Sequence, residues 1–159
     1  LRQRFVDLSQ GLPGFVHLSG REAAVSCLSR RHREVDEADY DQAIRESVRT
    51  AQESVITAYN KAVYSAKQNI YKDVLLACAL AKTDDRGKFS ASDIKDALTG
   101  ILQRPVLISS FARHLAAFCE ESRGPILRKF GKPKRHLYQF IDAPLQPYVV
   151  MMGKRDGLI

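Results

Sequence analysis

The sequence has no long apolar run and few cysteines. No stretch of the 159-residue chain holds 18 uninterrupted apolar residues, and no N-terminal signal precedes a small-residue cleavage site. We therefore expect no membrane span and a cytoplasmic location. The three cysteines, Cys27, Cys78 and Cys119, lie far apart in apolar surroundings and form neither a CxxC pair nor a Cys/His cluster. They predict buried free thiols and no metal site.

Catalytic groupings are also missing. No Ser/His/Asp or Cys/His set occurs at a spacing that indicates a nucleophile, so the sequence predicts no catalytic residue. An apolar content of 45% and a charged content of 27% are typical of a folded globular protein. The chain starts at Leu1 and enters a helical pattern at once, which suggests that it is a piece of a longer protein.

Positive charge is concentrated in one segment. The net charge is +7, and the stretch from Arg123 to Arg135 contributes six lysines or arginines without one acid. By contrast, Glu34 to Asp41 carries five acids and no base. A basic segment on a near-neutral body attracts polyanions, although an ordinary solvated turn has a similar composition.

The first half of the chain predicts helices only. Apolar spacing indicates helices over residues 1–10 and 13–29, the second with Phe15, Val16, Leu18, Ala24, Val25 and Leu28 on its apolar side. Asp36, with Asp39 three residues on, is typical of a capping box and begins one long helix over residues 36–64. Because so long a helix usually joins two bodies, we predict a helical subdomain over 1–66 and a second domain over 67–159.

The second half predicts two helices followed by a basic hairpin. Asn69 and Ser90 are candidate caps for helices over 70–81 and 91–102, and another helix is expected over 108–121. Strands over 126–130 and 136–141 enclose a Gly/Pro-containing turn, and an apolar helix over 145–152 ends at Gly153. The order is typical of a winged helix-turn-helix, so the predicted fold is mostly α, a helical bundle followed by a winged-helix domain with a short β-hairpin wing.

The predicted winged helix contains candidate contacts to double-stranded DNA. In the hairpin they are the cations Arg128, Lys129, Lys132, Lys134 and Arg135, which can pair with phosphates. In the helix over 108–121 they are the polar residues Ser109, Ser110, Arg113 and His114. Glu120 and Glu121 at the end of that helix would repel a DNA backbone.

Two short stretches resemble a known family. Gly11-Leu12-Pro13 between two helices, and the stretch from Val35 to Ile44, resemble the helical lid of AAA+ and STAND-type ATPases. A winged helix directly after the lid is the layout of the origin-recognition initiator ATPases. The resemblance implies that Gly11 and Pro13 approach a bound nucleotide. It also implies that a separate ATPase core of the parent protein binds ATP or ADP with magnesium, and it allows a homo-oligomer.

The chain departs from that family in two ways. It has no GxxxxGK[ST] motif and no hydrophobic run ending in paired acids, so we do not expect it to hydrolyse ATP by itself. The nearest arginine after Pro13 is Arg21, which favours a STAND-like lid over an initiator-like one. A helix stop at Gly11 and a restart at Pro13 explain the first stretch equally well. The second domain is expected either to bind DNA or to dock on the ATPase core or an oligomer neighbour.

Overall fold

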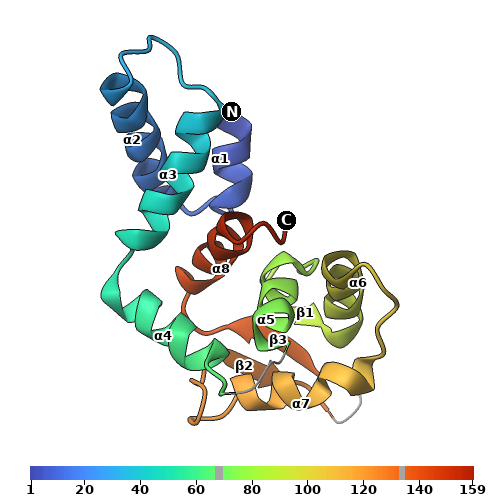
Figure 1. Ribbon diagram of the computed structural model, residues 1–159. Helices are drawn as coiled ribbons and strands as arrows, with labels where there is room; N and C mark the ends of the chain where they lie inside the picture. The colour runs from blue at the N-terminus through green and yellow to red at the C-terminus, as the bar shows by residue number, and fades with distance from the viewer. Residues whose placement is uncertain (67–69, 133–134) are drawn as a thin grey trace.

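The computed structural model describes residues 1–66, 70–132 and 135–159 and is mostly helical (Figure 1). The N-terminal helices are α1 (Arg2–Leu8), α2 (Pro13–Ser29), α3 (Glu37–Arg49) and α4 (Glu53–Val63). They are followed by α5 (Tyr71–Leu80), α6 (Ala91–Leu102), α7 (Ile108–Phe118) and α8 (Leu145–Arg155). None of the described helices is both long enough and apolar enough to cross a membrane. The expected mostly α class is confirmed.

A small antiparallel sheet accompanies the later helices. Its strands are β1 (Phe89–Ser90), β2 (Leu127–Phe130) and β3 (Leu137–Phe140), in the spatial order β1-β3-β2. The two strands expected from sequence are confirmed, whereas β1 was not expected. It is only two residues long, too short for an alternating pattern, and pairs with β3 through Phe89 opposite Tyr138.

The capping box predicted at Asp36 and the cap predicted at Ser90 are both confirmed. The Asp36 carboxylate accepts a hydrogen bond from the Asp39 amide at 3.0 Å, and the Asp39 carboxylate accepts one from the Asp36 amide at 3.1 Å. Ser90 and Asp93 make the equivalent pair at the start of α6. These bonds satisfy amide groups that have no partner within the helix. The expected cap at Asn69 lies outside the described residues.

The single long helix expected over 36–64 is wrong. The chain leaves helical conformation between α3 and α4, where Thr50 closes α3 and Gln52 is extended with ψ 136°. The Thr50 hydroxyl donates to the Glu46 carbonyl at 2.8 Å, a local bond that competes with helix continuation. No glycine or proline marks the break, so the apolar spacing alone did not reveal it.

The apolar side expected for α2 is only partly buried. Phe15 is in the core, but Val25 and Leu28 are 52% and 73% exposed. The buried side instead continues through Ser19, Ala23 and Cys27, and α2 packs closely against α3. Small side chains let two helices approach, so the expectation based on large apolar residues was wrong for this helix.

Helix α8 joins the two halves of the chain. It contacts α1, α3 and α4 on one side and α5 on the other, and Figure 1 shows it between them. It runs to Arg155, past the end expected at Gly153. A Cβ at Gly153 would lie 2.6 Å from Leu76 Cδ1, so glycine permits the close packing of α8 on α5. The division at residues 66 and 67 stays a prediction.

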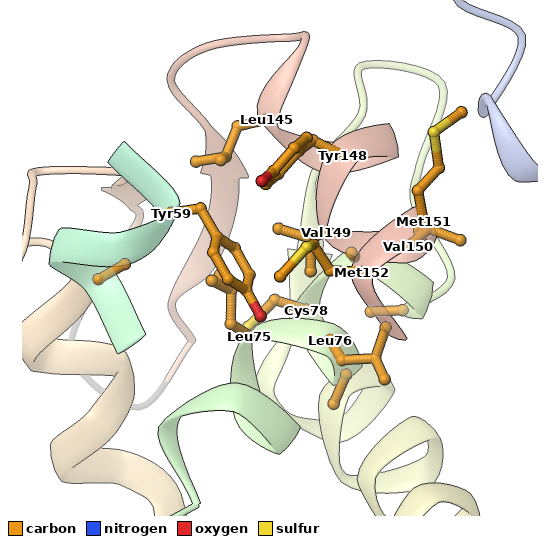
Figure 2. Packing of buried hydrophobic residues seen from close by; sticks show 14 of the residues in the cluster. Tyr59, Leu75, Leu76, Cys78, Leu145, Tyr148, Val149, Val150, Met151 and Met152 are labelled. Carbon is orange, nitrogen blue, oxygen red and sulfur yellow. The ribbon is translucent and has the colours of Figure 1, made fainter. Parts of the chain in front are cut away.

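The core around α8 is apolar and aromatic. Figure 2 shows Tyr59 of α4, Leu75 of α5 and Tyr148 of α8 in one cluster, and the two tyrosine rings meet edge to face at 5.5 Å. Burial of one large apolar side chain contributes roughly 1.5–3 kcal/mol. The cysteines are free thiols as expected, with Cys27 and Cys78 buried and Cys119 half-buried.

Candidate nucleic-acid interface

The hairpin between β2 and β3 turns at a residue that must be glycine. Gly131 has φ +91°, and a Cβ there would lie 2.6 Å from the Arg135 carbonyl oxygen. The Arg135 amide donates to the Lys132 carbonyl at 3.0 Å and closes the turn. The turn therefore holds Lys132 and Arg135 close together. Lys134, the remaining predicted contact, lies outside the described residues.

Four of the predicted hairpin cations are exposed and unpaired. They are Arg128, Lys129, Lys132 and Arg135. Within the described ranges, no carboxylate lies within 4.0 Å of any of them. Their positive charge is therefore not neutralised locally and is available to an external anion.

The cations on β2 do not all face the same way. Arg128 is opposite Gln139 and Lys129 is opposite Tyr138, so their side chains leave opposite faces of the sheet. The Lys129 face is the one that holds the buried Phe89 and Tyr138 rings, stacked at 6.4 Å. On the other face, Gln139 Nε2 donates to the Arg86 carbonyl at 2.8 Å. The hairpin thus offers two charged surfaces, which the sequence did not distinguish.

Three of the four polar residues predicted on α7 are exposed. Ser109, Ser110 and Arg113 lie on the side of α7 away from the core. The Ser110 hydroxyl donates to the Leu107 carbonyl at 2.7 Å, so it is already bonded. In the described part of the chain, Arg113 has no ion pair. Arg113 is thus the one long polar side chain of this set that a partner could contact.

The expectation that His114 faces a partner is wrong. Its side chain is 1% exposed, and its ring meets the Tyr71 ring edge to face at 4.6 Å. His114 follows Phe111 by three residues and precedes Phe118 by four, which places it on the buried stripe of α7. Burial lowers the pKa of His114, and the positive charge of Arg113 lowers it further. The buried ring cannot reach a base edge.

Arg123 has a structural role that sequence reasoning missed. Its Nη1 donates to the carbonyls of Ala62 at 2.8 Å and Tyr64 at 2.6 Å, at the end of α4. Its guanidinium also lies 3.6 Å from the centroid of the Tyr71 ring. Lys61 returns a bond from Nζ to the Gly124 carbonyl at 3.2 Å. These partners are about sixty residues away in sequence, so no local signal could have found them.

A groove opens beside α7. It lies between the start of α6, the first turns of α7 and the start of β3. Its lining is mainly apolar with two basic side chains, and consists of Ser90, Ala91, Ser92, Ile108, Ala112, Arg135, His136, Leu137 and Tyr138. The groove connects the exposed side of α7 with the turn end of the hairpin, so one ligand could contact both.

Gly11 and Pro13 lie at the junction of two helices, as the interpretation of a helix stop and restart expected. The Gly11 amide donates to the Val6 carbonyl at 3.1 Å with φ +73°, which ends α1. Pro13 is the first residue of α2. Both are exposed, next to a hollow lined by Leu12, Gly14, Phe15, Leu18, Thr50, Ala51, Gln52, Val55 and Pro144. Contact with nucleotide stays a prediction.

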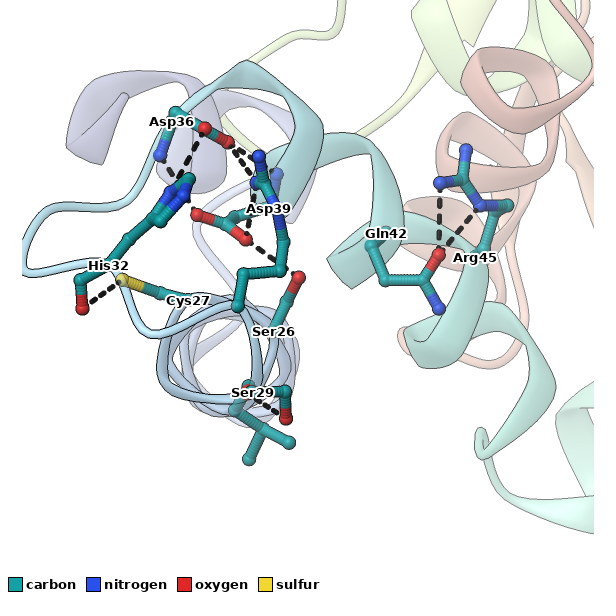
Figure 3. A network of polar contacts seen from close by, with 10 residues as sticks. Ser26, Cys27, Ser29, His32, Asp36, Asp39, Gln42 and Arg45 are labelled. Carbon is teal, nitrogen blue, oxygen red and sulfur yellow. Dashed lines mark hydrogen bonds and ion pairs between the residues drawn. The ribbon is translucent and has the colours of Figure 1, made fainter.

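A polar network at the start of α3 brings together three possible metal ligands. Donor atoms of His32, Asp36 and Asp39 lie within 4.8 Å of one another (Figure 3). Arg30 Nη1, however, bonds the Asp36 carboxylate at 2.6 Å and the Asp39 carboxylate at 2.9 Å. Its guanidinium holds the pKa of Asp36 well below the ordinary range. A cation would have to displace Arg30, so the network is better explained as a structural one.

Comparison of the chain with protein-family models, with curated proteins and with solved structures finds no match. The resemblance to an ATPase lid therefore stays a prediction from sequence.

Proposed function

We propose that this chain binds double-stranded DNA through the hairpin and the N-terminal half of α7. The observation that carries the proposal is the set of four exposed hairpin cations, Arg128, Lys129, Lys132 and Arg135, with no carboxylate of the described residues in ion-pair range. Unpaired cations on a protruding turn gain from pairing with phosphates, because each pair releases condensed counterions from the DNA.

The order of elements supports a winged helix as the binding unit. The chain passes through α5, β1, α6, α7, β2 and β3, and β3 lies between the other two strands. In a winged helix-turn-helix, α6 and α7 would form the helix pair and the β2–β3 hairpin the wing. The groove between them would then lie along a DNA backbone.

Charge along α7 indicates which end approaches the duplex. The helix has no side-chain N-cap and carries Arg113 in its first turns, while Glu120 and Glu121 follow its last turn. The positive end of the helix dipole favours phosphate near the N-terminus. We therefore place the N-terminal half of α7 at the DNA and its C-terminal end away from it.

We further propose that the chain is the non-catalytic C-terminal part of a AAA+ or STAND-like ATPase. Residues 1–66 would form the lid, with Gly11 and Pro13 near the nucleotide, and the parent's ATPase core would bind ATP or ADP with magnesium. The break between α3 and α4 and the contacts of α8 with α1, α3, α4 and α5 give a route by which lid movement could reach the hairpin.

Titration of short labelled duplexes over a range of salt concentrations tests the DNA proposal. Four phosphate contacts, from Arg113, Lys129, Lys132 and Arg135, predict a slope of roughly −3.6 in a plot of log binding constant against log salt, from about −0.9 per contact. The double change Lys132→Glu and Arg135→Glu should abolish binding. The matched control Arg31→Glu and Arg33→Glu, also exposed cations, should leave it largely intact. Absence of binding at low salt, or a normal affinity for the hairpin variant, would exclude the proposal.

A protein-docking role is the second candidate. The sequence suggested it for residues 67–159, but the exposed apolar pair that favours it lies on α2, where Val25 and Leu28 are side by side, one helical turn apart. This apolar pair fits the ATPase core or a second copy of the chain better than a polyanion. Leu28→Ser should weaken binding of the chain to its separately expressed core and leave duplex affinity unchanged. Docking without any duplex binding would favour this function over the first.

A further inference from the structure

The side of α7 that faces away from the core carries an apolar strip beside its polar residues. Ile108 is 41% exposed, and Ala112 and Ala116 are exposed one and two turns later. These three residues follow one another at intervals of four, so they form a single strip along the helix. With His114 buried, Arg113 is the only long polar side chain that α7 itself places beside them.

This strip adjoins the polar positions that the proposed DNA contact needs. Ser109 and Arg113 form the neighbouring strip of α7, again four residues apart. On the other side, Ile108 and Ala112 line the groove that also contains Arg135 of the hairpin. Methyl groups therefore lie between Arg113 on one side and Arg135 on the other, where the edges of bases would be if phosphates pair with those cations.

The chemistry of the major groove gives such a strip a specific ligand. Thymine presents its C5-methyl group there, and alanine and other apolar side chains contact it. Cytosine and uracil lack this methyl group but share the remaining surface of their methylated counterparts. We propose that Ile108, Ala112 and Ala116 recognise the C5-methyl group of pyrimidines in duplex DNA. This inference rests on the proposed DNA-binding function and commits to DNA because of the unpaired cations on both sides.

Duplexes that differ only in this methyl group test the proposal. Alternating dA·dT is compared with dA·dU, and dG·dC with the same duplex carrying 5-methylcytosine. Burial of one methyl group gives about a fourfold gain in affinity. We expect the methylated member of each pair to bind more tightly by about that factor or more. Equal affinities within both pairs would overturn the inference while leaving DNA binding intact, whereas no binding to any duplex would overturn the proposed function itself.

Variants separate direct contact from a change in DNA stiffness, which would affect every variant alike. Ile108→Ala should reduce the preference for methylated duplexes toward unity. Ala116→Ser should also reduce this preference, and it serves as the test if Ile108→Ala folds poorly. Leu28→Ala, an exposed apolar side chain on α2, is the matched control and should keep the full preference. Arg113→Gln should weaken both members of each pair equally. A preference that survives Ile108→Ala and Ala116→Ser would overturn the contact.

Discussion

Arg123 and the hairpin cations lie within thirteen residues of one another but have opposite surroundings. Arg123 bonds two carbonyls at the end of α4 and lies against the Tyr71 ring. Lys132 and Arg135 project into solvent and have no acidic partner in the described part of the chain. Arg123 stabilises the fold through internal bonds, whereas Lys132 and Arg135 are available to bind an external anion.

The difference shows why a count of charges in a segment does not measure its affinity for a polyanion. A guanidinium that caps helix carbonyls already has its hydrogen bonds made, and moving it to a phosphate would leave those carbonyls unsatisfied. An exposed lysine loses only hydration and rotamer freedom when it pairs with a phosphate. Four predictions test this division between structural and available cations.

The largest effect is expected at Arg123. Arg123→Ala removes two charge-assisted hydrogen bonds and a cation–π contact, and should lower the free energy of unfolding by about 2 kcal/mol. Denaturant titration measures this loss. The matched control Arg128→Ala should change stability by less than about 0.5 kcal/mol, because Arg128 is exposed. Equal losses for the two variants would contradict the comparison.

A smaller effect is expected from protonation of His114, whose ring packs against Tyr71 and makes stability depend on pH. The folded state lowers the pKa of His114 below 6.5, so the unfolded chain binds a proton that the folded chain does not. Stability should therefore fall as the pH drops below about 6.5, at up to about 1.4 kcal/mol per pH unit. His114→Gln should flatten the slope in this range, while His17→Gln, at an exposed position, should retain it. If the slope of stability against pH persists in His114→Gln, a group other than His114 takes up the proton on unfolding.

The sequence predicted helices best where a local signal marks their ends. The side-chain caps at Asp36 and Ser90 and the proline that begins α2 are local features, and each helix begins within a residue of where they indicate. No glycine or proline marks the break after Thr50, where the Thr50 hydroxyl bonds the Glu46 carbonyl, so apolar spacing alone missed it.

The candidate site could be predicted only in outline. The exposed cations of the hairpin follow from composition and turn residues. By contrast, the burial of His114 and the internal bonds of Arg123 depend on Tyr71 and on the end of α4, which are remote in sequence. The spacing of His114 from Phe111 and Phe118 places it on the buried stripe of α7, and this spacing was the available signal that His114 faces inward.

Arg30 is another structural cation, and its contribution to the stability of the fold should depend on pH in the acid range. Its bond to Asp36 keeps the pKa of that carboxyl below the ordinary 3.8, so the stabilisation is present above about pH 4 and is lost as the pH falls through the lowered pKa. Arg30→Gln should reduce the loss of stability between pH 5 and pH 2 in thermal unfolding scans. The control Arg31→Gln, one residue along, should leave the acid profile unchanged; a change of equal size would show that the α3 network is not the cause.

The smallest effect divides the available cations among themselves. Lys129 shares one face of the sheet with Tyr138, and Arg128 shares the opposite face with Leu137; both Tyr138 and Leu137 line the groove beside α7. We place the duplex on the Tyr138 side, so it should contact Lys129 and not Arg128. Lys129→Gln should reduce the salt slope of binding by about 0.9, the value of one phosphate contact, and Arg128→Gln should leave it unchanged. The reverse result would place the duplex on the Leu137 side of the sheet, opposite the side proposed here.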